Sequence, residues 1–292
     1  LHLSIRRQRQ MCIRDRKHYV AALGQDPYSY AYLKEAAIDS GVVTIRTAGM
    51  EALSKIVSGK SFVNTFRSRS NRVKIEILDI IKEQFAKGDV GTMAIGAGIL
   101  SNKKIGYRNL IQNDSFLIAA ATKLSLPREI ETYNEIKKAL AYINNVKYKA
   151  EKNSYNHPIN WKTLATVSDS TIAVVRTNKG NFTIKLFGNT TPGSVANFID
   201  LANDDFFDNK VYHRVVSNFV IQGGCPRGDG YGSLDYSIRS ELPQLYYDDE
   251  GYVGMASAGL HTEGTQWFVT HSPTPHLDGK YTIFGLLSLI HI

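Results

Sequence analysis

The sequence predicts a multi-domain chain with an all-α N-terminal part and a mainly-β C-terminal part. Between residues 17 and 146, apolar side chains recur every three to four positions, the spacing of amphipathic helices, and no segment alternates with a period of two. From about residue 171, β-branched and aromatic residues alternate with polar ones in short runs, as in half-buried strands. A length of 292 residues is enough for two domains with separate cores.

The helical part is divided by proline and by breaks in the apolar periodicity. Asp26-Pro27 is expected to open a first helix, because proline is favoured in a first helical turn. Further helices are expected wherever apolar residues share one face, near residues 43–58, 72–87, 89–100, 107–123 and 129–144.

A weak internal repeat is present in this part. Residues 43–53 align with residues 90–100, and small residues occur in both copies. The period and the small residues resemble HEAT-type repeats, in which helix pairs bury their apolar faces by stacking on their neighbours. We therefore expect residues 17–146 to form a HEAT-like repeat domain that offers a surface to a protein partner. An irregular helical bundle is the alternative.

The composition and the apolar periodicity change after the helices. Residues 147–168 are polar and aperiodic, which is typical of a linker. A hairpin is expected next, with strands near 171–177 and 181–187 joined by an Asn-Lys-Gly turn. Thr190 or Thr191 is expected to cap the following helix, which has Pro192 in its first turn.

Composition and charge exclude some classes of protein. A hydrophobic content of 43% and a charged content of 21% are ordinary for a globular protein, and no run reaches the 18 apolar residues of a membrane span. The net charge is +8, but residues 1–16 contain five arginines and one aspartate, so half of that charge lies in the first 16 residues. A nucleic-acid partner is therefore not expected. If the chain did bind nucleic acid, its affinity would fall steeply with salt concentration.

Both ends of the sequence have an unusual composition. Residues 9–15 and 287–292 resemble translated sequencing adapters, so we expect residues 1–16 and 288–292 to be non-native extensions of a fragment. A genuine basic N-terminus is the alternative, although it lacks the pattern of a signal peptide. Apart from these ends, Cys225 is the sole cysteine, which excludes an internal disulfide. The sequence leaves a cytoplasmic and a periplasmic location open.

Two short segments carry the functional signal. Residues 212–224 read Tyr-His-Arg-Val-Val-Ser-Asn-Phe-Val-Ile-Gln-Gly-Gly, and residues 265–268 read Thr-Gln-Trp-Phe. They resemble the (Phe/Tyr)-His-Arg-x-x-x-x-Phe-x-x-Gln-Gly-Gly and (Ser/Thr)-Gln-Phe-Phe strands of the cyclophilins, a family of prolyl isomerases. Pro192 and Asn197-Phe198 resemble that family's first helix.

The resemblance implies a fold and an activity for residues 169–287. The fold is a cyclophilin-like closed barrel, expected to be truncated before its last strand, because the family continues beyond Phe284-Gly285 with a strand, a helix and a closing strand. The activity is that of a peptidyl-prolyl cis-trans isomerase, which needs no cofactor. It would assist protein folding by acting on proline-containing polypeptide clients.

The chemistry of prolyl isomerisation explains why an arginine is expected in the site. Amide resonance creates a rotation barrier of about 18–20 kcal/mol. A hydrogen bond to the prolyl nitrogen lowers this barrier if it forms mainly in the twisted transition state, where the nitrogen regains its lone pair. By resemblance Arg214 is the donor, and its guanidinium is always charged and presents several donors in one plane. Gln222 is expected to orient Arg214 and to contact the substrate.

The resemblance also assigns the substrate pocket. An apolar slot would hold the proline ring, and Gln266 would share a face with Phe268, because residues two apart on a strand point the same way. The expected substrate-binding residues are Phe219, Val220, Ala256, Ser257, Gln266, Phe268, His276, Leu277 and Tyr281.

The sequence departs from the family pattern at four of these positions. Val220 replaces a methionine, Ser257 an asparagine and Tyr281 a histidine. His276 occupies the position of a tryptophan in cyclosporin-sensitive members, so weak cyclosporin binding is expected.

The residues of the C-terminal part also bear on two other functions. A non-catalytic module that binds proline-containing peptides on a helical scaffold is the main alternative to an enzyme. Metal binding is not expected, because the histidines of this part lack ligand spacing and acidic companions; they are His213, His261, His271 and His276.

Overall fold

The computed structural model describes residues 13–288 and divides the chain into two compact units. The helical unit comprises the described residues up to Leu124 together with Glu131–Glu151, and the β unit comprises Ser125–Ile130 and the described residues from Lys152 onward. Most of the two predicted terminal extensions, residues 1–12 and 289–292, lies outside the described residues.

The helical unit follows the predicted periodicity closely. Its helices are α2 (Ile13–Leu23), α3 (Tyr30–Leu33), α4 (Val43–Ser58), α5 (Ser61–Phe66), α6 (Ser70–Lys87), α7 (Val90–Ser101), α8 (Ser115–Ala121) and α9 (Ile130–Ile143). The single helix expected over 107–123 is wrong. A 3₁₀ turn at Tyr107–Asn109 and α8 replace it, and the Asn113 side chain accepts a hydrogen bond from Ser115 N (2.8 Å) between them.

Two glycines show what the internal repeat does in three dimensions. Gly49 of α4 and Gly96 of α7 are both the seventh residue of their aligned segments. A Cβ at Gly49 would lie 2.8 Å from Ala37 Cβ, and a Cβ at Gly96 would lie 3.0 Å from Phe85. Gly49 thus allows close packing against the helical turn Lys34–Ile38 that follows α3, and Gly96 allows close packing against α6. Whether the helical unit is a HEAT-type repeat stays a prediction.

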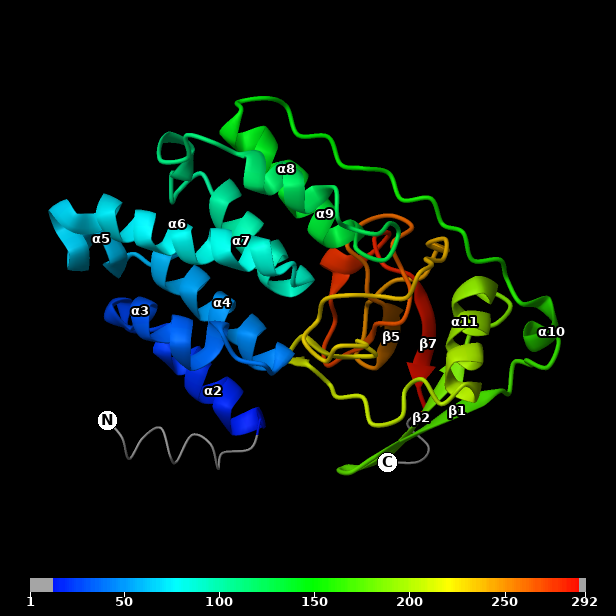
Figure 1. Ribbon diagram of the computed structural model, residues 1–292. Coiled ribbons are helices and arrows are strands. Elements are labelled where there is room, and N and C mark those ends of the chain that lie inside the picture. The colour runs from blue at the N-terminus through cyan, green and yellow to red at the C-terminus, as the bar shows by residue number, and fades with distance from the viewer. Residues whose placement is uncertain (1–12, 289–292) are drawn as a thin grey trace. The chain divides into compact units, whose positions relative to one another are not determined.

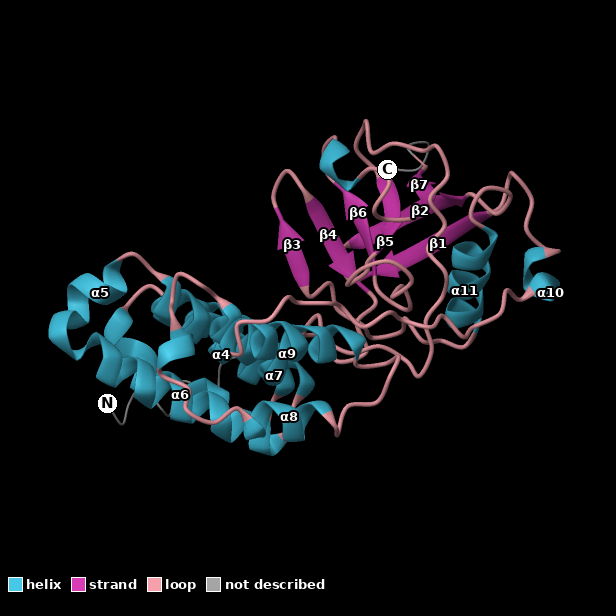
Figure 2. Ribbon diagram, turned by 90° about the horizontal axis from the view of Figure 1, so that it is seen from above, coloured by secondary structure: helices cyan, strands magenta, loops and turns pink. Residues whose placement is uncertain are grey.

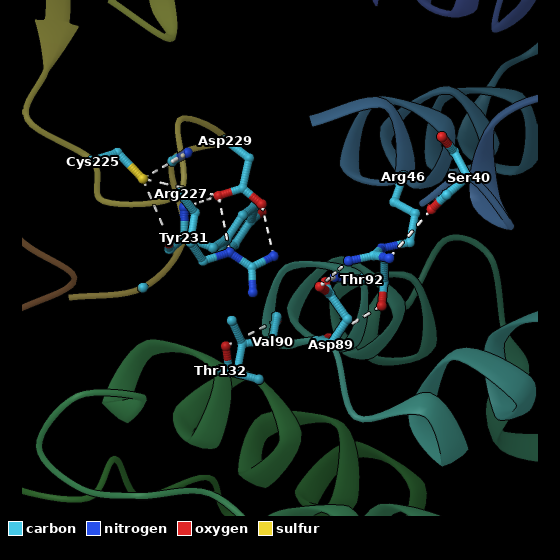
Figure 3. Close-up of polar contacts among 12 residues, drawn as sticks. Ser40, Arg46, Asp89, Val90, Thr92, Thr132, Cys225, Arg227, Asp229 and Tyr231 are labelled. Carbon is cyan, nitrogen blue, oxygen red and sulfur yellow. Dashed lines mark hydrogen bonds and ion pairs between the residues drawn. The ribbon is translucent and has the colours of Figure 1, made fainter. Parts of the chain in front are cut away.

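A polar contact joins the two helices of the repeat. Asp89 caps the N-terminus of α7 by accepting a hydrogen bond from Thr92 N (3.0 Å). Arg46 of α4 donates to the other oxygen of the same carboxylate (2.9 Å) and to the Ser40 carbonyl (3.2 Å), as Figure 3 shows. The charge-assisted pair therefore fixes α4 against the start of α7.

The β unit is built on one antiparallel sheet. Its strands are β1 (Ile172–Thr177), β2 (Gly180–Leu186), β3 (Arg214–Val216), β4 (Val220–Gly223), β5 (Tyr252–Met255), β6 (Trp267–Thr270) and β7 (Ile283–Leu287). They lie in the order β1-β2-β7-β5-β6-β4-β3 (Figure 2). The predicted β1–β2 hairpin is confirmed. The described strands make a curled half-barrel with β1 and β3 at its edges, in line with the prediction of a barrel without its last strand.

The two faces of this sheet carry separate apolar clusters. Helix α11 (Pro192–Asn203) lies beside β1 and β2 in Figures 1 and 2, and Val195 and Phe198 pack from it onto Ile184, Met255 and other buried residues of one face. A second cluster contains Val220, Tyr247, Phe268, Leu277 and Ile283. Along β6, Trp267 and Val269 belong to the first cluster while Phe268 belongs to the second, as strand alternation requires.

The start of α11 differs from the prediction. Thr191 occupies the N-cap position, but its side chain makes no capping hydrogen bond and instead donates to the Phe187 carbonyl (3.3 Å). The carboxylate of Glu241 accepts from Gly193 N and from Ser194 N, both at 2.9 Å. A negative charge at a helix N-terminus is favourable, so a residue far away in sequence supplies the cap.

The segment expected to be a linker makes many contacts within the β unit. Residues 161–164 form the short helix α10 (Trp161–Leu164), and the Asn160 and Thr163 side chains donate to Asp200 of α11 (3.1 and 2.5 Å). The preceding residues hydrogen-bond to Ser237, at Asn156 and His157. Over residues 13–288, no helix combines the length and the apolarity needed to cross a membrane.

Candidate active site

The β3–β4 hairpin places the motif residues at the edge of the sheet. Arg214 is paired with Gln222 across the hairpin, Gln222 is paired with Phe268 of β6, and Phe268 is paired with Gly254 of β5. Directly opposed residues in antiparallel strands project to the same face. The register therefore aligns Arg214, Gln222 and Phe268 in one row on one face of the sheet.

A chain of hydrogen bonds connects the polar residues of this face. Arg214 Nη1 donates to Gln222 Oε1 (3.2 Å), and Gln222 Nε2 donates to Gln266 Oε1 (3.1 Å). Gln266 Nε2 in turn donates to the carbonyls of Gly230 (3.0 Å) and Gly232 (3.4 Å). We call this chain the amide relay. A guanidinium can only donate and a backbone carbonyl can only accept, so both ends fix the orientation of the two glutamine amides.

The glycine-containing loop that ends the amide relay is held by a buried carboxylate. Asp229 accepts from Arg227 Nη2 (2.9 Å) and from Tyr231 N (3.1 Å), contacts that Figure 3 draws. The Asp229 side chain is 1% exposed. Cys225 lies beside it, and its sulfur accepts from Gly230 N (3.3 Å). Burial raises the pKa of the Cys225 thiol, so the thiol acts here as a small buried side chain.

Apolar side chains form the floor next to Arg214. Val220, Phe268 and Leu277 are almost fully buried (2%, 5% and 8% exposed) in the second cluster. The predicted residues Phe219, Ala256 and Tyr281 pack against this cluster while remaining partly exposed. The structure therefore brings most of the predicted apolar pocket residues into one place.

Aromatic rings line the rim of this floor. His276 stacks on Phe219 with ring centroids 5.3 Å apart, and Arg214 Cζ lies 5.5 Å from the centre of the Phe219 ring. Tyr281 meets Phe268 edge to face at 5.9 Å. Arg214 itself is exposed, and among residues 13–288 no carboxylate forms an ion pair with it. Its remaining donors face solvent next to an apolar surface.

The segment Ala256–Gln266 closes the site on the side of β5 and β6. Ala256 N donates to the Gln266 carbonyl (2.9 Å), so the two ends of this segment meet. Gln266 immediately precedes β6 rather than lying within it. Ser257 lies next to Ala256 and is partly exposed, and among the described residues its hydroxyl makes no hydrogen bond within the amide relay.

A fully buried carboxyl group lies in the same segment. Glu263 is 0% exposed and accepts hydrogen bonds from Thr282 Oγ1 at 2.8 and 3.0 Å. Burial raises its pKa to about 7, and the hydrogen bonds from Thr282 oppose that rise. Glu263 was not predicted from the sequence, because nothing in its neighbours indicates burial.

Two further residues shape the pocket without having been predicted. Tyr247 is fully buried and its ring stacks on Phe268 at 5.9 Å. Gly254 lies beneath both rings, where a side chain would overlap Tyr247 Oη and Phe268. The pair Tyr246-Tyr247, directly before three acidic residues, is the sequence signal that could have indicated a buried aromatic here.

The fold and this face define a mainly-β domain with an exposed arginine beside an apolar cluster. The family model described as cyclophilin type peptidyl-prolyl cis-trans isomerase/CLD matches residues 172–289. The chain is 44% identical over 118 residues to a peptidyl-prolyl cis-trans isomerase of Synechococcus elongatus, covering 39% of this chain and 79% of the relative. It is 46% identical over 102 residues to peptidyl-prolyl cis-trans isomerase B of Bacillus subtilis, covering 35% and 71%.

Solved structures give similar matches. A crystal structure of a Cryptosporidium parvum cyclophilin type peptidyl-prolyl cis-trans isomerase is 35% identical, covers 40% of this chain and 76% of that chain, and has a TM-score of 0.39. The same protein crystallised in the presence of the dipeptide Ala-Pro gives 40% and 77% coverage and the same TM-score.

Through its β unit the chain belongs to the cyclophilin-type peptidyl-prolyl cis-trans isomerases. The predicted family, the fold class and the assignment as an isomerase are thereby confirmed. The roles of individual site residues stay predictions.

Proposed function

We propose that the β unit accelerates rotation about Xaa-Pro bonds by a hydrogen bond from Arg214 to the prolyl nitrogen in the twisted transition state. We further propose that this assists the folding of proline-containing polypeptides. The observation that carries the proposal is the position of Arg214. Its guanidinium is exposed, held on one side by Gln222, and adjacent to an apolar floor.

The hydrogen bond would act on the transition state more than on the ground state. In the planar amide the nitrogen lone pair is delocalised and accepts poorly, whereas in the twisted state it is localised. A donor at this atom therefore lowers the barrier by differential binding, and each 1.36 kcal/mol of difference increases the rate about tenfold.

The amide relay would supply the orientation that this step needs. Gln222 Oε1 takes one N–H of Arg214, which restrains the plane of the guanidinium without neutralising its charge. A carboxylate in the same place would bind the guanidinium more tightly and compete with the substrate. Gln222 is thus proposed to orient Arg214, and Gln266 to orient Gln222.

The apolar floor would hold the proline ring while the acyl part rotates. Phe219 is partly exposed beside Arg214, and it packs against the cluster that contains the buried residues Val220, Phe268 and Leu277. Burying an apolar ring contributes roughly 25 cal/mol per Å². His276 and Tyr281 are proposed to complete the rim through their contacts with Phe219 and Phe268.

The test is the rate of cis–trans exchange in a short Ala-Pro peptide, measured by exchange NMR with the full chain and its Arg214→Ala variant. We expect acceleration by the wild-type chain and a loss of at least about tenfold in the variant, since a charged hydrogen bond in the transition state is removed. Arg176→Ala is the matched control, because Arg176 is an exposed arginine on β1. It should leave the rate unchanged.

A second outcome would favour the alternative function. If the folded chain shifts the peptide resonances but does not accelerate exchange, the β unit is a proline-peptide-binding module and the catalytic proposal fails. Equal rates for the wild type and Arg214→Ala would instead contradict the role of Arg214. The docking of a protein partner on the helical unit stays a prediction.

A further inference from the structure

The segment Asn153–His157 contacts the loop that carries several candidate substrate residues. We call this segment the strap. Asn153 Nδ2 donates to the His261 carbonyl and to Ser237 Oγ, both at 2.6 Å. The ring of Tyr155 meets the His261 ring edge to face at 4.8 Å. The strap therefore holds His261, which lies four residues beyond Ser257.

The strap is itself anchored by hydrogen bonds to the backbone of Ser237. The Ser237 carbonyl accepts from the amides of Asn156 (3.2 Å) and His157 (3.3 Å), and Ser237 N donates to Asn156 Oδ1 (3.2 Å). None of these bonds involves the side chain of Asn153. Removing that side chain should consequently leave the strap in place.

A second path leads from the strap to the other end of the same loop. The His157 ring stacks on Tyr236 at 4.0 Å, and Tyr236 Oη donates to Asn197 Oδ1 (2.7 Å). Asn197 Nδ2 then donates to the Gly264 carbonyl (2.7 Å), two residues before Gln266. The strap thus acts on residues 256–266 at two points, His261 and Gly264.

His261 needs such support because of its backbone conformation. Its φ is 64°, in the left-handed region that side chains other than glycine rarely adopt. Ser240 holds it on one side, where Ser240 N donates to His261 Nδ1 (3.1 Å) and His261 N donates to Ser240 Oγ (2.9 Å). Asn153 supplies the hydrogen bond to its carbonyl on the other side.

We propose that Asn153 and Tyr155 are positioning residues for substrate binding, acting through His261 on Ala256, Ser257 and Gln266. The proposal rests on the proposed function of the β unit. Asn153 and Tyr155 precede residues 172–289, the segment that the family model matches, and yet they would shape the peptide site.

The experiment compares full-length Asn153→Ala, Tyr155→Ala and Asn160→Ala with the wild type. Peptide affinity is measured by NMR titration with a short Ala-Pro peptide, and the exchange rate is measured at saturation. Asn160 is the matched control, because it bonds to Asp200 and to the start of α10 and not to residues 256–266. Hydrogen exchange of the amides of residues 257–265 gives an independent readout.

We expect Asn153→Ala to weaken peptide binding about fivefold, the typical effect of losing a single hydrogen bond, here the one to the His261 carbonyl, with an unchanged rate at saturation. Amides 257–265 should exchange faster in this variant. Tyr155→Ala should also weaken peptide binding and speed up the exchange of amides 257–265. This variant will fold, because Tyr155 is 48% exposed. Asn160→Ala should change neither.

Wild-type affinity and wild-type amide exchange in both strap variants would overturn the proposal. A wild-type chain that does not accelerate exchange would instead refute the proposed function, while the amide exchange of residues 257–265 would still decide the role of the strap. A lower rate at saturation with unchanged affinity would show that the strap acts on the chemical step, contrary to this proposal.

Discussion

Glu263 shows how a single buried group can set the pH dependence of the whole β unit. Its carboxyl is fully buried and hydrogen-bonded to Thr282, and burial raises its pKa to about 7. The folded state therefore binds a proton more tightly than the unfolded chain does. The contribution of Glu263 to the free energy of unfolding is fully present below pH 4.5, the ordinary pKa of a glutamate carboxyl group. This contribution is lost as the pH rises through about 7.

We predict that Glu263→Gln abolishes the loss of stability with rising pH. At pH 5 the variant and the wild type should have similar free energies of unfolding, whereas at pH 8 the variant should be more stable by up to about 3 kcal/mol. Urea denaturation at the two pH values measures the difference. A variant that loses stability in parallel with the wild type between pH 5 and pH 8 would show that Glu263 is not the group responsible.

Among the residues of the candidate site, the sequence predicted the side chains that take part far better than the backbone groups. Arg214, Gln222, Phe219 and Phe268 were predicted because they lie in two contiguous motifs, and the register brings three of them into one row. The carbonyls of Gly230 and Gly232, which end the amide relay, could not be predicted. Every residue has a carbonyl, so only the fold decides which one faces a given side chain.

At the scale of elements, β5 depends on the absence of a side chain at Gly254. Gly254 is paired with Phe268, and a Cβ at Gly254 would lie 2.5 Å from Phe268 Cζ and would also overlap Tyr247 Oη. The glycine therefore lets two aromatic rings pack beneath the candidate pocket.

We predict that Gly254→Ala destabilises the β unit by about 1–3 kcal/mol, the usual effect of overpacking a core. It should also weaken binding of an Ala-Pro peptide, because Phe268 must move. Urea denaturation and NMR titration measure the two effects. Gly41→Ala is the control, since a Cβ there has no neighbour within 4 Å. Wild-type stability in Gly254→Ala would mean that the Tyr247 and Phe268 rings move aside without lowering the free energy of unfolding.

The ends of helices were the weakest part of the sequence-based prediction. The periodicity of apolar residues located α4, α6 and α9, and the dense run of apolar and small residues located α7, which is buried on all sides. The cap of α11 was missed because Glu241 lies about fifty residues away from it in the chain. A cap supplied by a distant side chain leaves no local pattern.

For the whole molecule, the strap bears on where the isomerase unit begins. The sequence places residues 147–168 in a linker, yet hydrogen bonds tie Asn153, Asn156 and Thr163 to the rest of the β unit. Glu151, in contrast, pairs with Lys137 of α9 in the helical unit (2.7 Å). Apart from the separate segment Ser125–Ile130, we therefore propose that the β unit begins near residue 152.

We predict that a chain of residues 152–288 has a Tm roughly 5 °C above that of residues 165–288, because the shorter chain lacks the strap and α10. Thermal unfolding followed by circular dichroism measures this. Residues 147–288 are the control and should match residues 152–288, since residues 147–151 belong to the helical unit. Equal Tm values for the starts at 152 and 165 would support a boundary closer to 169.

The amide relay also bears on how the protein would respond to acidity. It consists of a guanidinium, two carboxamides and two backbone carbonyls, and none of these kinds of group gains or loses a proton in the range where proteins stay folded. Isomerisation by Arg214 would need no proton transfer, so the chemical step would be decoupled from the acidity of the compartment. A loss of activity at high or low pH would then reflect unfolding or loop movement rather than a change in the catalytic group.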